Sequence, residues 1–68
     1  MAIRITDTFT GETATINDTS DLADTIRPWY PDAPAQVYEV ITDFETKLRA
    51  GEYYGDEAAY LGLKLEYI

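Results

Sequence analysis

The chain has 68 residues, of which 46% are hydrophobic and 13% aromatic, and thirteen acidic residues outnumber five basic ones to give a formal net charge of −8. One domain over residues 1–68 with a small core is expected, and the hydrophobic fraction argues against disorder. Because the chain has no His and no Cys, it lacks the usual general base, thiol nucleophile, disulfides and Cys- or His-based metal sites. We therefore expect no enzyme activity, no metal and no cofactor.

The first residues show no charged segment followed by an apolar run, and no stretch approaches the roughly 20 apolar residues of a membrane span. We therefore expect a cytoplasmic protein. A strongly negative field repels nucleic acid and anionic lipid and attracts basic protein surfaces. The charge thus predicts a basic protein partner, with no direct nucleic-acid or membrane binding. Solubility or adaptation to high salt is the alternative explanation.

The N-terminal residues predict a β-hairpin. Apolar and polar residues alternate before and after Thr10-Gly11, which supplies the turn. Residues 2–17 are therefore expected to form two strands with a shared apolar face. That face consists of Ile3, Ile5, Ala14 and Ile16.

Two registers of this hairpin are compatible with the sequence. A two-residue turn would pair Ile5 with Ile16. A four-residue turn would pair Ile5 with Ala14, and it would bring Ile3 opposite Ile16. Both registers keep the apolar side chains on one face, so the choice stays open. Phe9 lies beside the turn, either folded over the sheet edge or exposed, and we expect partial exposure.

A short helix is predicted after the hairpin. Residues 18–20 are Asp, Thr and Ser, and any of the three can cap a helix N-terminus. Pro28 would break a continuing helix, so we expect the helix to end near Ile26 or Arg27. Trp29 follows in a tight loop, where it is expected to cover the core.

The longest helix is predicted over residues 34–50, with the sequence PAQVYEVITDFETKLRA. Its apolar residues recur three and four apart, which places them on one stripe of a helix. Asp32 stands where an N-cap belongs, and Gly51 follows as a C-terminal stop. The rest of the chain must cover the stripe, which consists of Val37, Val40, Ile41, Phe44 and Leu48.

The C-terminal residues predict a last strand. From Ala59 onward apolar and polar residues alternate to the end of the chain, and we expect a strand at about residues 60–67. Residues 56–59 could instead begin a short helical turn. Tyr53 and Tyr54 lie in the preceding polar loop, and at least one of them should be exposed because adjacent residues do not both face inward.

Together these elements predict an α+β fold in the order β-β-α-α-β. A three-stranded sheet in the order 2-1-3 would pack its apolar face on the main helix as a two-layer sandwich. The first strand is placed in the centre, which leaves the Thr-rich second strand at an edge. The direction of the last strand does not follow from the sequence.

The spacing of the carboxylates does not support a metal site. Asp18, Asp21 and Asp24 recur every three residues but lack the ligand positions of an EF-hand loop, and helix capping explains them better. Glu39 and Asp43 stand four residues apart on the main helix, without a third ligand.

An acidic surface remains as the candidate site. Asp32, Glu39 and Asp43 are expected roughly along one helix face, with carboxylates one turn, or about 5.4 Å, apart. This spacing is comparable to that of the phosphates along a DNA strand. Ion pairs to Lys47 and Arg49 would make this an ordinary solvated face, which is the alternative. With tyrosines as anchors, the predicted partner-binding residues are Asp21, Asp24, Asp32, Glu39, Asp43, Glu45, Tyr53 and Tyr54.

In size, acidity and predicted ββααβ order, the chain resembles small inhibitors made by phages and mobile elements, including anti-CRISPR proteins that block the DNA-binding groove of a defence complex. The resemblance implies a stoichiometric inhibitor that acts by binding. The predicted function is therefore that of a non-catalytic DNA mimic, monomeric or dimeric, which occupies the basic surface of a nucleic-acid-binding protein or CRISPR effector in the host cytoplasm. The alternatives are an interaction or regulatory module that dimerises through an edge strand and tyrosines, and a small halophilic protein.

Overall fold

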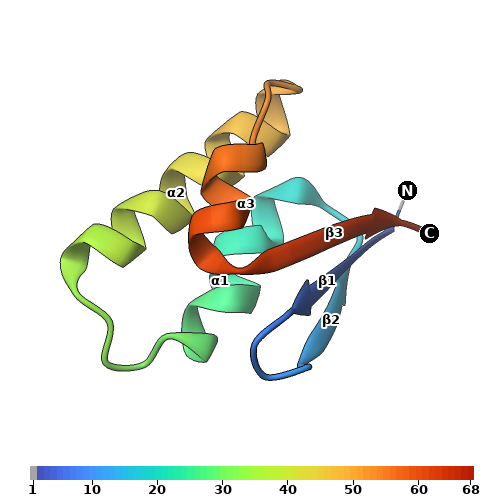
Figure 1. Cartoon of the computed structure of the whole chain (residues 1–68). Coiled ribbons are helices and arrows are strands. Elements are labelled where there is room, and N and C mark those ends of the chain that lie inside the picture. The colour runs from blue at the N-terminus through green and yellow to red at the C-terminus, as the bar shows by residue number, and fades with distance from the viewer. Residues whose placement is uncertain (1) are drawn as a thin grey trace.

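The computed structural model describes residues 2–68 and has two layers (Figure 1). A three-stranded antiparallel sheet forms one layer, and helices packed on one of its faces form the other. The strands are β1 (Ile3–Asp7), β2 (Thr13–Ile16) and β3 (Leu63–Tyr67). The α-helices are α1 (Leu22–Ile26), α2 (Ala35–Ala50) and α3 (Gly55–Leu61), and α1 is flanked by two 3₁₀ helices, η1 (Thr19–Asp21) and η2 (Arg27–Trp29).

The sheet confirms the predicted order, with β1 in the centre between β2 and β3. Both outer strands run antiparallel to β1, which answers the question of the direction of the last strand. In the hairpin, Ile5 pairs with Ala14 and Ile3 pairs with Ile16. The four-residue turn is therefore the correct one of the two registers.

Asp7 organises the hairpin turn from a buried position, with only 5% of the residue exposed. Its N–H donates to the carbonyl of Glu12 at 2.8 Å, and its Oδ1 accepts from the N–H of Phe9 at 2.9 Å and of Thr10 at 3.4 Å. Gly11 completes the turn with a φ of 81°, a left-handed conformation that costs glycine little. These hydrogen bonds satisfy the buried carboxylate, whose role the sequence pattern had not indicated.

The turn is fastened to the start of β3. Thr8 binds the carbonyl of Gly62 twice, through its N–H at 2.9 Å and its hydroxyl at 2.7 Å. Phe9 is 84% exposed, yet its ring lies over Gly62, where a Cβ atom would collide with it. The hairpin loop and the α3–β3 junction therefore depend on one another, although they are more than 50 residues apart in sequence.

The helical layer begins as the capping pattern predicts. Asp18 is the N-cap of η1, and its Oδ1 accepts from the N–H of Ser20 at 2.9 Å and from the Ser20 hydroxyl at 2.8 Å. The backbone hydrogen bond is the main reason why the pKa of Asp18 is lowered. α1 ends at Ile26, as expected from Pro28, and the chain continues as η2.

α2 follows the predicted range of 34–50 to within one residue. Ile41, Phe44 and Leu48 are buried, and Gly51 ends the helix with a left-handed φ of 73°. The prediction that Asp32 caps this helix is wrong. Pro34 is the N-cap residue, with extended backbone, and no side chain caps the helix. Because Pro34 also disfavours helical backbone in the residue before it, the helix cannot begin close to Asp32.

The segment after α2 differs from the prediction in one respect. A third helix, α3, includes the first two residues of the predicted strand at 60–67, and β3 begins only at Leu63. Ala58 and Leu61 are the buried residues of α3, three positions apart, whereas Ala59 and Tyr60 are exposed. The short helical turn considered for residues 56–59 is therefore the better alternative, and Gly62 ends it.

Two tyrosine hydroxyls hold the loop between η2 and α2. The hydroxyl of Tyr30 donates to the carbonyl of Leu61 at 3.0 Å, and the hydroxyl of Tyr38 donates to the carbonyl of Tyr30. Burial, and secondly the charge of Asp7, raise the pKa of Tyr30 to about 12. Trp29 is half-buried against the core beside this loop, as expected for a residue that covers it.

The raised pKa of Tyr30 predicts a loss of stability at alkaline pH. The folded chain holds this proton more tightly than the unfolded chain, so the contribution of Tyr30 is complete below pH 10 and is lost as the pH rises towards about 12. The pKa of Tyr54 is also raised, mainly by burial. In urea unfolding between about pH 8 and pH 11.5, the free energy of unfolding should fall less steeply for Tyr30→Phe than for the wild type. Tyr53→Phe alters an exposed ring and is the control, and an equal slope for Tyr30→Phe would contradict the assignment.

Candidate functional site

Charge is distributed unevenly between the two layers. Residues 18–61, which form the helical layer, hold ten of the thirteen acidic residues and three of the five basic ones. Those three basic residues each make an ion pair. Arg4 and Lys64, for which the described residues provide no ion pair, are exposed on the face of the sheet that points away from the helices. The helical layer therefore carries carboxylates that basic side chains leave unneutralised.

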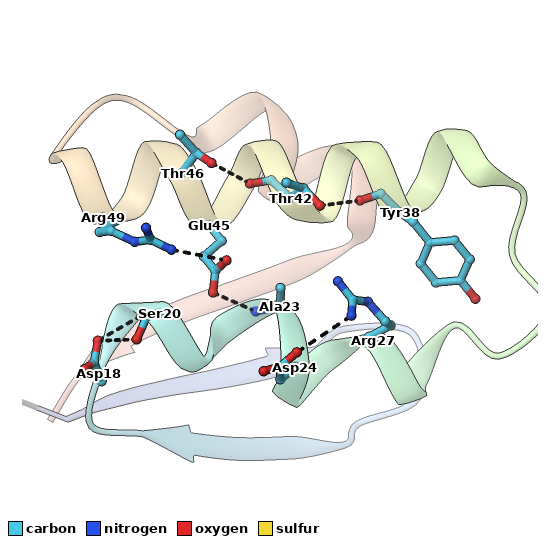
Figure 2. Close-up of polar contacts among 10 residues, drawn as sticks. All are labelled: Asp18, Ser20, Ala23, Asp24, Arg27, Tyr38, Thr42, Glu45, Thr46 and Arg49. Carbon is cyan, nitrogen blue, oxygen red and sulfur yellow. Dashed lines mark hydrogen bonds and ion pairs between the residues drawn. The ribbon is translucent and has the colours of Figure 1, made fainter.

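The outer side of α2 has a shallow groove of about 400 Å³, the α2 groove. It is lined by Tyr38, Glu39, Thr42, Asp43 and Thr46, which share one side of the helix because they recur three and four residues apart. The hydroxyl of Thr42 donates to the carbonyl of Tyr38 at 3.1 Å, and that of Thr46 to the carbonyl of Thr42 at 2.9 Å (Figure 2). With both hydroxyls bound to the backbone, the methyl groups of the two threonines form part of the apolar lining of the groove.

Glu39 and Asp43 give the α2 groove its charge. Glu39 is exposed, and no ion pair joins it to another residue in the described part of the chain. Asp43 lies 3.6 Å from the Nζ atom of Lys47, but Lys47 donates a shorter hydrogen bond of 2.7 Å to Glu57. The hydrogen bond between Lys47 and Glu57 is the main reason why the pKa of Lys47 is raised and the pKa of Glu57 is lowered. Because Lys47 lies closer to Glu57, it offsets the negative charge of Asp43 only in part.

Glu45, which was predicted to bind the partner together with Glu39 and Asp43, does not share their face of α2. At about 100° per residue, the side chain of Glu45 is rotated by about 120° from Glu39 and by about 160° from Asp43. Its Oε1 accepts from the N–H of Ala23 at 3.4 Å, near the start of α1, and its Oε2 lies 3.5 Å from Arg49 (Figure 2). Only 13% of the Glu45 side chain is exposed. Glu45 therefore joins α1 to α2 and is not free for a partner.

The other predicted carboxylates lie away from the α2 groove. Asp32 is exposed in the loop before α2, so it does not continue the helical row of Glu39 and Asp43. Asp21 is exposed at the end of η1. Asp24 is exposed on α1, where it lies 3.7 Å from Arg27 (Figure 2). The structure thus brings two of the predicted carboxylates together in one groove.

The two predicted tyrosine anchors have different environments. Tyr53 is 75% exposed, whereas Tyr54 is half-buried and stacks on Phe44 with ring centroids 5.4 Å apart. This confirms that at least one of the pair is exposed. The Tyr53 ring lies over Gly55, where a Cβ atom would collide with it. Tyr53 is therefore accessible to a partner, and Tyr54 belongs to the packing of α3 on α2.

Three residues of the α2 groove were not among the predicted site residues. They are Tyr38, Thr42 and Thr46. Their spacing of four residues places them on the same side of a helix as Glu39 and Asp43, and this signal was present in the sequence. The signal was hard to recognise because a half-buried tyrosine and two threonines do not by themselves indicate a binding site.

No group of three or more His, Cys, Asp or Glu side chains within residues 2–68 is placed to hold a metal ion. In the same part of the chain, no helix has the length and apolar character needed to cross a membrane. Comparisons with protein-family models, curated proteins and solved structures found no match to this chain. Its function is therefore inferred from its surface.

The different positions of Glu45 and Glu39 predict different effects of the same substitution. Glu45→Ala removes the acceptor for the N–H of Ala23 and the partner of Arg49, and we expect the free energy of unfolding to fall by about 1 kcal/mol, as for a lost helix cap. Glu39→Ala removes the same atoms and the same charge at an exposed position, and the free energy of unfolding should stay within experimental error. Urea unfolding measures both variants. Equal losses would show that Glu45 does not join α1 to α2.

Proposed function

We propose that this protein is a non-catalytic binding protein that places the α2 groove on a basic protein surface. Glu39 and Asp43 carry the proposal, as two weakly neutralised carboxylates one turn apart on the most acidic layer of the molecule. An Arg or Lys side chain suits this groove, since its aliphatic stem can pack on the threonine methyls and the ring of Tyr38. Its charged end then meets the carboxylates and forms charge-assisted hydrogen bonds.

We further propose that the basic partner is a nucleic-acid-binding protein, such as a CRISPR effector or another defence complex, which this chain inhibits by occupying its phosphate-binding surface. Carboxylates about 5.4 Å apart along a helix offer such a surface a spacing similar to that of phosphates along a strand. The net charge of −8 favours rapid association with a basic groove and opposes binding to nucleic acid itself. The resemblance to anti-CRISPR inhibitors is in keeping with this role.

The α2 groove is testable with a defined basic probe. In an NMR titration with an arginine-rich peptide, we expect the largest chemical-shift changes at the amides of residues 38–46. The affinity for the peptide should fall as the salt concentration rises from about 0.05 M to about 0.5 M, because salt screens the charges. The double variant Glu39→Lys plus Asp43→Lys should bind the peptide at least about ten-fold more weakly. The control, Glu12→Lys plus Glu52→Lys, makes the same change in net charge at exposed positions outside the groove. A salt-independent affinity, or equal losses in the two double variants, would contradict the assigned groove.

The identity of the partner requires a second experiment. The immobilised chain is used to capture proteins from a host lysate, and the captured proteins are identified by mass spectrometry for the wild type and for both double variants. We expect to capture a basic nucleic-acid-binding protein with the wild type and with the control variant, but not with the groove variant. Added duplex DNA should release this protein from the immobilised chain. A partner that binds through the groove but is not displaced by DNA would refute the mimicry and leave the groove intact as a binding site.

A further inference from the structure

We propose that β3 pairs with β3 of a second copy of this chain, which would join two three-stranded sheets into one of six strands. β3 forms one edge of the sheet, and its neighbour within the sheet is β1. In Figure 1 it runs beside β1 towards the C-terminus and belongs to the sheet layer, whereas α2 belongs to the helical layer. The two surfaces are separate, so this pairing does not depend on the α2 groove.

The hydrogen-bond pattern shows which backbone groups of β3 are free. The N–H of Thr8 donates to the carbonyl of Gly62 at the start of the β1–β3 ladder. At its other end, the N–H of Ile68 donates to the carbonyl of Ala2. Because the direction of these groups alternates along a strand, the even-numbered residues of β3 bind β1 and the odd-numbered residues point outward. The outward N–H and C=O groups are those of Leu63, Leu65 and Tyr67.

Antiparallel pairing centred on Leu65 would use all of these groups. Leu65 would face its own copy across the two-fold axis, and Leu63 would face Tyr67. On the open face of the sheet, Lys64 would come directly opposite Glu66 of the second copy, and symmetry repeats this pair. Opposite charges in such positions stabilise a strand pair, and like charges destabilise it. The sequence of β3 is therefore complementary to itself in this register.

Charged residues on an edge strand more often prevent pairing. In β3 the two charges have opposite sign and stand symmetrically about Leu65, so the register that uses every free backbone group also matches the charges. The other edge, β2, is four residues long and has no charged residue to select a register. Its Thr-rich sequence does not provide the complementarity of β3.

The exposed surface at this edge also favours a partner. Tyr67 is 58% exposed and Ile68 is 54% exposed, so a second copy would cover apolar surface at the end of β3. A pair of five-residue strands buries a small area compared with a standard protein interface. We therefore expect a weak dimer, with a dissociation constant on the order of 10 μM.

The test changes the charges of Lys64 and Glu66 and measures self-association by sedimentation velocity. The protein concentration runs from about 1 μM to about 500 μM, and an ionic strength of about 0.15 M screens the net charge. The wild type should become dimeric within this range. Lys64→Glu places Glu opposite Glu66 in both pairs, and Glu66→Lys places Lys opposite Lys64. Each single variant should dimerise about ten-fold more weakly or worse. The double variant Lys64→Glu plus Glu66→Lys restores opposite charges and should recover the affinity of the wild type.

A mixture of the two single variants provides the most specific readout. Each variant repels itself, but Glu at position 64 of one chain meets Lys at position 66 of the other, so heterodimers should form in preference to either homodimer. Thr15→Lys adds a charge to the open face at β2 and should leave dimerisation unchanged, and circular dichroism checks that every variant is folded. A wild type that stays monomeric throughout, a dimer insensitive to both single variants, or a mixture without preference for heterodimers would overturn the proposal.

Discussion

Burial of one side of α2 is the constraint on which the rest of the structure depends. Ile41 and Phe44 are completely buried, and a chain of 68 residues has only a small core to offset the entropy lost on folding. β1 supplies the opposing layer through Ile3 and Ile5, and α1 and α3 complete the cover of the helix. Because the buried side of α2 is committed in this way, its other side must face solvent, and the residues there are free to serve binding.

The same constraint separates acidic residues that look alike in the sequence. A helix rotates by about 100° per residue, so Glu39 and Asp43 share the outer side of α2 whereas Glu45 is turned towards α1. There Glu45 accepts a hydrogen bond at the start of a helix, where a negative charge is favourable. Asp7 is likewise used inside the fold, in a turn. The net charge of −8 therefore overstates the charge that a partner meets, and the α2 groove is one place where two neighbouring carboxylates remain available.

The two proposed surfaces belong to different layers and would act together. The α2 groove lies on the helical layer, and the edge of β3 belongs to the sheet layer. A dimer that forms through β3 has both helical layers on the same side of a continuous sheet, because an antiparallel pair places equivalent residues on the same face. Two α2 grooves would then face one partner, and binding of the first would raise the effective concentration of the second.

The sequence by itself determined the α+β class, the range of α2, its stop at Gly51 and the central place of β1, since these follow from apolar spacing and local backbone preferences. It left the hairpin register open because both registers present the same apolar face. α3 was mistaken in part for a strand, since Ala58 and Leu61 fit a short helix only when α2 is there to pack against. Tertiary structure alone decided which carboxylate is structural and which is free, as Glu45 and Glu39 show, because hydrogen bonds and ion pairs depend on neighbours in space.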